Sequence, residues 1–463
     1  MLRAWARLAD GALASRITAS VRALKRAQTP VVSSYPNAWD ARSMSLKTIL
    51  DWLDLVPHQL ILSLLVVLAI PNVMLLGTAY LILLERKIAS WVQDRIGPNR
   101  VGPKGSLQPI ADGIKFLFKE DFTPARVEVV LFYLAPLLAI VPALLGWAII
   151  PWGGFIKIDE FTFNLFGHAI KLGGYTLNVC ALPIPIGVIY VLAVGSLAVY
   201  GVVIAGYASN NKFSFLGGLR ATAQMLSYEI PLGLCVLIVL LIVGSSRADY
   251  IIASQTLGNT WHIFHMPLLA IIFFTCNLAE TNRAPFDLAE AEQELVGGYH
   301  TEYSSMRFAL FFLGEYLHMI TAAGFFTLMF LGGWSISPLG LWPDLPYVAS
   351  GSLLSVVLIA GLKFGVFAAK ITAIISLMML IRWTLPRFRF DQLMKLAWRS
   401  LIPVTMALLV IAGAVVFFKV THWWLLTGNL VVLLFVATLG SKLPQGPNVN
   451  RRVALEGSRF SGI

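Results

Sequence analysis

Charged residues are scarce in this chain. Only 13% of its 463 residues are Asp, Glu, Lys or Arg, whereas 57% are hydrophobic. A water-soluble domain carries about 25% charged residues, so this chain has too few to cover a soluble surface of its size. The deficit excludes an ordinary soluble protein and predicts a polytopic membrane protein.

Cysteine is also rare. Cys180, Cys235 and Cys276 lie far apart, each inside or beside an apolar run, and no CxxC pair occurs. This spacing argues against an iron–sulfur cluster, a structural zinc site or a disulfide framework, so we expect no metal site. The sequence also lacks a nucleotide-binding loop, a nucleophile elbow and an HExxH motif, which argues against a self-contained enzyme.

Long apolar runs are abundant. A helix needs about 20 apolar residues to cross a hydrocarbon core of roughly 30 Å. Nine runs approach or exceed this length: 60–84, 129–152, 182–208, 230–244, 263–279, 308–333, 353–381, 401–418 and 423–440. We therefore predict an all-α bundle of about nine transmembrane helices.

The basic residues indicate how these helices are oriented. If the runs alternate across the membrane, the connecting segments on one side carry 21 Lys and Arg, against four on the other. Positive residues concentrate in cytoplasmic loops, so the first set is predicted to be cytoplasmic. The net charge of +11 is interpreted as this topology signal, and no nucleic-acid partner is expected.

The first 59 residues do not fit this pattern, because they carry eight Lys and Arg yet fall on the opposite side. Their Arg-rich, acid-poor start suits an interfacial amphipathic helix, a disordered extension or an organellar transit peptide, and we favour one of the first two. We predict a basic extension over 1–59, an eight-span core over 60–420, and an extra span with a tail over 421–463.

The loop after the first run contains a second kind of helix. Gly and Pro interrupt the chain up to Pro109, after which apolar residues recur at helical spacing as far as Phe118. This pattern predicts a short amphipathic helix lying on the membrane surface. On composition alone, a plain surface helix is favoured.

The segment 280–303 carries six acids and one Arg on the side where positive charge is expected. Pro285 is placed as in a first helical turn, and Asp287, Glu290 and Glu294 would then share one face. Crowded carboxylates near a low dielectric raise one another's pKa values and hold protons near neutral pH. A proton-handling device and a solvated acidic loop are equally good interpretations of this composition.

Ionisable residues also lie within or beside the predicted spans: Glu229, Glu315, His318, Lys363 and Lys370. A charge at membrane depth costs roughly 2.5–3.5 kcal/mol, so such residues face a polar cavity or a partner. This favours a proton-handling role for the acids.

Several longer motifs together resemble one known family. They are ERK at 85–87, GPNRVGP at 97–103, LQPIAD at 107–112, LRA at 219–221, SYE at 227–229, AETNRAPFD at 279–287, EY at 302–303 and PRFRFDQL at 386–393. In this order, from about residue 60 to 419, the chain resembles the H subunit of the bacterial proton-pumping NADH:quinone oxidoreductase, the counterpart of mitochondrial complex I subunit 1.

The resemblance implies a membrane subunit without a redox centre, which joins the hydrophilic electron-transfer arm to the pumping arm of the membrane. Such a subunit forms the quinone chamber, from which a line of buried acids leads towards antiporter-like subunits. Carried onto this chain, the quinone-binding residues are Arg86, Arg95, Asp112, Arg283 and Phe286. The acids of the proton path are Glu229, Glu280, Asp287, Glu290, Glu292, Glu294 and Glu315.

The resemblance also implies partners and a location. Ubiquinone or menaquinone is the substrate, no cofactor is bound by this chain alone, and NADH, FMN and iron–sulfur clusters belong to partner subunits. The partners are the quinone-site subunits of the hydrophilic arm, small membrane-arm subunits and the lipid bilayer. We expect a bacterial inner membrane, with the quinone-site loops cytoplasmic, rather than a mitochondrial one.

Three features depart from the family or receive no role from it. His300 stands where bacterial members usually have Asn, the extension and the ninth span exceed the family core, and Lys363 and Lys370 are unassigned. One alternative is the related membrane subunit of a membrane-bound hydrogenase or formate hydrogenlyase. Another is a secondary transporter, although the sequence shows no second copy of the acidic loop.

Overall fold

The computed structural model describes residues 46–442, apart from 159–160, 166–167, 173–174, 259, 289–294, 341 and 351–352. The prediction for the basic extension therefore lies outside the described residues up to residue 45, as does the tail from residue 443. Glu290, Glu292 and Glu294 of the acidic segment also lie outside them.

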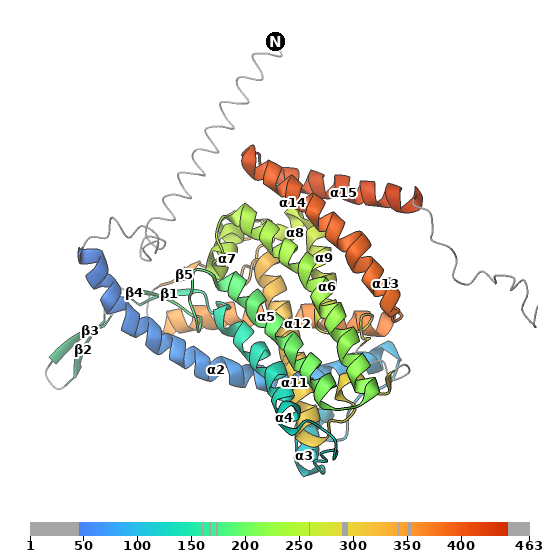
Figure 1. Ribbon diagram of the computed structural model, residues 1–463. Helices are drawn as coiled ribbons and strands as arrows, with labels where there is room; N and C mark the ends of the chain where they lie inside the picture. Colours follow the sequence, from blue (N-terminus) through green and yellow to red (C-terminus); the bar gives the residue numbers. More distant parts are fainter. Residues whose placement is uncertain are drawn as a thin grey trace, which may run out of the picture.

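Within the described residues, long apolar helices form a bundle (Figure 1). Seven stretches are long and apolar enough to cross a membrane, and two shorter apolar helices accompany them. The seven are α2 (Leu46–Val92), α4 (Val129–Leu145), α5 (Gly187–Ala208), α6 (Lys212–Val243), α11 (Ser305–Phe330), α12 (Leu353–Thr384), and the run of α13 (Phe390–Lys395), the π-helical η4 (Leu396–Leu401) and α14 (Ile402–Phe417). The shorter ones are α9 (Pro267–Glu280) and α15 (Trp423–Lys442). The predicted all-α membrane bundle is confirmed.

Helix α6 begins at Lys212 rather than at residue 230, where the apolar run starts. The side chain of Asn211 caps it by accepting a hydrogen bond from the Phe213 amide at 3.0 Å. The first half of α6 buries polar side chains such as Ser214 and Gln224 against the rest of the bundle. These polar residues interrupt the apolar run, which is why counting apolar residues finds only the second half.

The predicted amphipathic helix is confirmed as α3 (Gln108–Phe118), with Pro109 in its first turn. None of its residues is buried, and Leu117 and Phe118 are 65% and 88% exposed. Its contact with a membrane surface stays a prediction.

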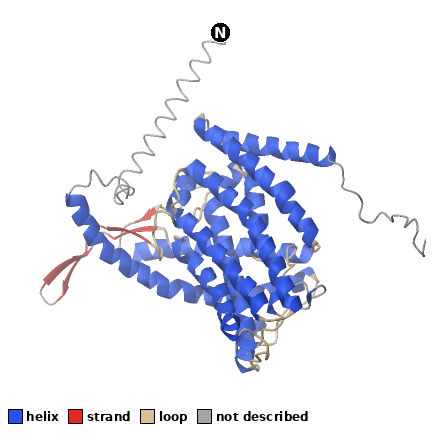
Figure 2. Ribbon diagram, viewed as in Figure 1, coloured by secondary structure: helices blue, strands red, loops and turns tan. Residues whose placement is uncertain are grey.

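Short strands between α4 and α5 were not predicted. After η2 (Gly146–Ile149) come β1 (Phe155–Ile158), β2 (Phe161–Leu165), β3 (His168–Leu172) and β4 (Tyr175–Asn178), while β5 (Val348–Ala349) precedes α12. β1 pairs antiparallel with β4 and parallel with β5, and β2 pairs with β3. Figure 2 shows the strands gathered at one edge of the molecule, beside the start of α2. Gln59 of α2 makes two hydrogen bonds to the Asn178 backbone at 2.9 and 3.0 Å, so the first helix is anchored to this sheet.

The remaining described helices are short. They are η1 (Pro103–Gly105), α7 (Ala248–Leu257), α8 (His262–His265) and η3 (Gly298–His300). We call the end of the bundle that carries α3 the α3 end, and the end that carries β1, β4 and β5 the strand end.

Helix α11 runs between these two ends and packs against α2, α4, α9 and α12. Close backbone packing positions its neighbours: a Cβ on Gly201 of α5 would lie 2.7 Å from the Ala139 amide nitrogen of α4. A Cβ on Gly217 of α6 would lie 2.7 Å from the Gly298 Cα at the end of the acidic segment. Glycine at these two positions lets α5, α6 and the acidic segment pack tightly around α11.

Candidate functional site

The α3 end contains a buried cluster of charged side chains. Glu85 of α2 accepts hydrogen bonds from the Tyr316 hydroxyl of α11 and the Arg382 guanidinium of α12. Nη1 of Arg283, which follows α9, lies 3.4 Å from each Glu85 carboxylate oxygen, and its Nε lies 2.7 Å from Oε1 of Glu315. Glu85 and Arg283 are only 7% and 5% exposed. Two carboxylates and two guanidinium groups thus neutralise one another, as buried charges require.

A polar cavity of about 580 Å³ adjoins this cluster. Its lining combines the Glu85 carboxylate with three guanidinium groups, those of Arg86, Arg95 and Arg382. The other lining residues are Ile82, Ala89, Ser90, Ile96, Gly97, Pro98, Phe312, Tyr316 and Trp383. An uncharged polar group or an anion of moderate size would find hydrogen-bond donors here.

A second cavity, of about 390 Å³, lies between α2, α3 and α11 and is mainly apolar. Four residues line both cavities and mark their junction: Ile82, Arg86, Phe312 and Tyr316. Together the two cavities offer an apolar compartment followed by a polar one, which matches an amphipathic molecule.

Helix α3 is linked to α2 at this junction. Nη1 of Arg86 lies 2.7 Å from Oδ2 of Asp112, and the Gln108 amide donates to Oδ1 of Asp112 at 3.1 Å. Arg86 is 46% exposed, so this ion pair is partly in solvent. The structure thus brings together Arg86 and Asp112, two of the residues expected to bind quinone.

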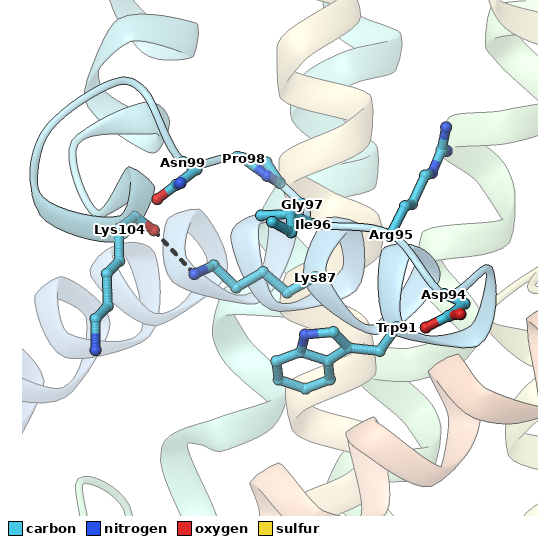
Figure 3. Close-up of a pocket in the computed structure, with 9 residues that line it drawn as sticks. All are labelled: Lys87, Trp91, Asp94, Arg95, Ile96, Gly97, Pro98, Asn99 and Lys104. Atoms are coloured by element: carbon cyan, nitrogen blue, oxygen red, sulfur yellow. Dashed lines mark hydrogen bonds between the residues drawn. The ribbon is translucent and has the colours of Figure 1, made fainter.

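The loop that follows α2 forms a third cavity, of about 450 Å³, on the far side of Arg95 (Figure 3). The Lys87 ammonium donates to the Lys104 carbonyl at 2.9 Å, drawn as a dashed line. Gly105 has φ of +81°, and a Cβ there would lie 2.2 Å from the Pro98 carbonyl oxygen. The loop is therefore folded tightly on itself, and it fixes the position of Arg95, which lines both the polar cavity and this one.

The acids predicted to carry protons lie deeper along the helices. Glu280 ends α9, and its Oε1 lies 3.4 Å from Nε2 of His318 on α11. Glu229 of α6 interacts with the Ser196 hydroxyl of α5 and is within electrostatic reach of Glu280. Glu315, Glu280 and Glu229 therefore follow one another from α11 through α9 to α6.

The described part of the acidic segment, 281–288, forms turns rather than the predicted helix from Pro285. Nη2 of Arg387 lies 2.9 Å from Oδ2 of the buried Asp287. Phe286 is buried between Tyr228 and Phe388, with both ring centroids 5.6 Å away. This packing and the buried ion pair hold 281–288 against neighbouring elements without a helix. Phe286 and Asp287 are not among the residues that line the two joined cavities.

Gln224 of α6 fixes the path of this segment. Its amide nitrogen donates to the Ala279 carbonyl at 2.8 Å and to the Phe286 carbonyl at 2.6 Å. Such a buried amide satisfies backbone groups that no helix pairs.

Sequence reasoning missed three members of the charged cluster as site residues: Glu85, Tyr316 and Arg382. Glu85 belongs to the ERK motif, and Tyr316 directly follows Glu315. Arg382 lies in the last turn of α12. A signal was therefore present at each position, but their meeting depends on how α2, α11 and α12 pack.

The two unassigned lysines lie towards the strand end. The Lys370 ammonium donates to the carbonyls of Leu331, Gly333 and Ser335 at 2.6, 2.9 and 2.6 Å. Lys363 is fully buried and donates to the Tyr347 carbonyl at 3.0 Å. Lys370 thus supplies donors to carbonyls at and just beyond the C-terminus of α11, where backbone acceptors have no partner within the helix.

The histidines of the described residues differ in what surrounds them. His262 is buried near the strand end, and its Nδ1 lies 3.0 Å from the Met329 carbonyl oxygen. Burial lowers the pKa of His262 to about 4, so this side chain stays neutral at physiological pH. His300 packs its ring against Tyr299 and Phe308, with centroids 5.0 and 5.2 Å away. Within the described residues, no group of three or more His, Cys, Asp or Glu is arranged to hold a metal ion.

Comparison with known proteins finds relatives over most of the chain. A family model described as NADH dehydrogenase matches residues 63–413. The H subunit of the NADH-quinone oxidoreductase of Leptospira biflexa is 46% identical, over 72% of this chain and 88% of its own length. Two further proteins, each named as the first H subunit of an NADH-quinone oxidoreductase, are both 42% identical. The one from Cytophaga hutchinsonii covers 75% of this chain and 95% of its own length, and the one from Geobacter sulfurreducens covers 74% and 91%.

Proposed function

This chain belongs to the NADH dehydrogenase family, that of the H subunit of NADH-quinone oxidoreductase, a membrane subunit of complex I; we propose that it forms the quinone-binding chamber of that complex. We further propose that it couples quinone reduction to proton transfer through its buried acids.

The observation that carries this proposal is the pair of joined cavities at the α3 end. A quinone has a polar ring and a long apolar tail. The apolar cavity between α2, α3 and α11 suits the tail, and the polar cavity lined by Arg86 and Arg95 suits the ring. Asp112 fixes the Arg86 guanidinium at the junction, and Arg283 holds the Glu85 carboxylate at the edge of the polar cavity. Phe286 supports this region from behind.

Reduction of a quinone to a quinol consumes two protons and changes the local charge. The Glu85, Arg283 and Glu315 cluster adjoins the polar cavity, so a change of charge there alters the proton affinity of the nearby carboxylates. From Glu315 the acids continue to Glu280 and Glu229. We assign Asp287, Glu290, Glu292 and Glu294 to the same path.

The chain would carry out this role only within the assembled complex. We propose that residues 1–59 form an extension, 60–420 the core and 421–463 an added span with a tail. Quinone-site subunits of the hydrophilic arm would cover the α3 end, which then faces the cytoplasm of a bacterium. NADH, FMN and iron–sulfur clusters would be held by those partners, and this chain would contribute no redox centre.

Replacing Glu280 by Gln tests the coupling. We expect quinone-linked NADH oxidation and proton pumping by the complex in membrane vesicles to fall about tenfold or more, because a positioned acid–base group is lost. NADH oxidation by an artificial acceptor should stay near normal, since electrons then leave before the quinone.

Glu302→Gln is the matched control. The Glu302 carboxylate accepts a hydrogen bond from the Asn211 amide at 2.6 Å, which a Gln oxygen can also accept, and Glu302 is not assigned to the path. The control should retain both activities. Normal pumping by Glu280→Gln would contradict the proposed function, and loss of both activities together would indicate failed assembly.

A further inference from the structure

His318 occupies a gap in the line of acids. It lies one turn after Glu315 on α11, at a spacing of three residues that places the two side chains on one face. Its Nε2 lies 3.4 Å from Oε1 of Glu280 on α9. The side chains of His318 and Glu280 are 16% and 18% exposed, so the pair is largely enclosed by the bundle. An imidazole thus stands between two carboxylates that belong to different helices.

The contact between His318 and Glu280 leaves room for water. Nε2 of His318 is buried and makes no hydrogen bond of good geometry within the described residues. A cavity of about 30 Å³ adjoins both side chains. Roughly 10–15 Å³ is enough to hold one water molecule when polar groups line the site. The polar groups here are those of Asn277, Glu280, His318 and Thr321.

The surroundings of the imidazole contain few other titratable groups. The residues that line the cavity from α4, η2, α5 and α6 are Pro142, Gly146, Val191, Leu192, Gly195 and Leu232, none of which titrates. The titratable neighbours are therefore Glu280 across the cavity and Glu315 on the same helix. Glu229 acts on Glu280 from α6, and Arg283 pairs with Glu315.

Resting on the proposed function, we propose that His318 relays protons between Glu315 and Glu280. The imidazole accepts a proton on one ring nitrogen from the Glu315 side and releases the proton of the other nitrogen to the Glu280 carboxylate through the cavity water. One proton enters and one leaves, and the ring returns to its neutral form after exchanging tautomers. Imidazole suits this step because it exchanges protons near neutral pH and has two distinct nitrogens.

His318→Asn tests the relay in the assembled complex. Asn keeps a hydrogen-bonding side chain but does not titrate. We expect quinone-linked NADH oxidation and pumping to fall about tenfold, less than the usual 10²-fold for an acid–base group, because the cavity water remains. The pH profile of quinone-linked oxidation should lose the limb that an imidazole contributes near neutral pH. His422→Asn, at an exposed position outside the acid line, is the matched control and should leave both unchanged.

Gly195→Ala provides an independent variant if His318→Asn fails to assemble. A Cβ on Gly195 would lie 3.4 Å from Oε1 of Glu280, so the new methyl group takes part of the cavity without touching the imidazole. Pumping should fall severalfold, with the same change of pH profile.

The outcomes separate this inference from the proposed function. If Glu280→Gln impairs pumping while assembled His318→Asn or Gly195→Ala keeps the wild-type rate and pH profile, the relay is overturned and the proposed function stands. If Glu280→Gln itself pumps normally, the proposed function fails first.

Discussion

The two ends of the bundle bury charge in different ways. At the α3 end, the Glu85 and Glu315 carboxylates share the Arg283 and Arg382 guanidinium groups beside two cavities. Towards the strand end, Lys370 is held by three backbone carbonyls. One arrangement pairs groups that can exchange protons, and the other fixes a single cation against groups that cannot.

This difference indicates what each region does. Backbone carbonyls keep their charge and position through any reaction, so they hold Lys370 as a structural support for the end of α11. Coupled carboxylates next to a cavity redistribute protons whenever the charge in that cavity changes. The buried charges at the α3 end are therefore the better candidates for energy coupling.

The largest effect is expected from Arg283→Ala. The substitution leaves the Glu85 and Glu315 carboxylates buried with much of their compensating charge removed, a change that costs about 3–5 kcal/mol. Quinone-linked NADH oxidation should be lost, and less complex should assemble, as blue native gels with activity staining would report. Arg283→Lys keeps one positive charge and should restore part of the assembly. Full quinone-linked activity of Arg283→Ala would remove this cluster from the account.

A smaller effect, of another kind, is expected from Lys370→Met. Charge-assisted hydrogen bonds contribute about 1.5–3 kcal/mol each, and the apolar side chain offsets only part of their loss. The thermal stability of the complex should fall, while the turnover of each assembled complex with quinone stays near normal. The comparison between the two ends would break if Lys370→Met assembled well but pumped poorly.

The smallest effect is expected from Arg86→Ala at the junction of the two cavities. Its ion pair with Asp112 is partly exposed, and exposed pairs contribute about 0.2–1 kcal/mol. The apparent KM for a water-soluble quinone should therefore rise about fivefold or less, with kcat largely retained. Asp112→Asn, which removes the same ion pair from the α3 side, should give a similar rise. A hundredfold loss of kcat in Arg86→Ala would instead show that this guanidinium takes part in the chemistry.

Much of the fold could be predicted from hydrophobicity alone. Each of the nine apolar runs overlaps a helix, and the surface helix at Gln108–Phe118 follows from helical spacing after Pro109. The first half of α6 could not be found in this way, because Ser214 and Gln224 are buried against other elements rather than facing lipid. The strands beside α2 were missed because residues 153–181 carry no long apolar run.

The candidate site was predictable to a lesser degree. Charged residues within spans directed attention to Glu315 and His318, because their burial requires a partner. The partners themselves, Arg283 for Glu315 and Glu280 for His318, come from segments joined only by tertiary packing. The predicted helix at Pro285 was wrong over 285–288, where Asp287 is instead fixed by an ion pair with Arg387.

The central claim is that charge at the α3 end, and not at the strand end, couples quinone reduction to proton transfer. The most direct measurement is the number of protons translocated per NADH oxidised, in proteoliposomes that contain either the Glu280→Gln or the Lys370→Met complex. The account predicts a lowered ratio for Glu280→Gln and the wild-type ratio for Lys370→Met. A wild-type ratio in Glu280→Gln, or a lowered ratio in Lys370→Met, would contradict it.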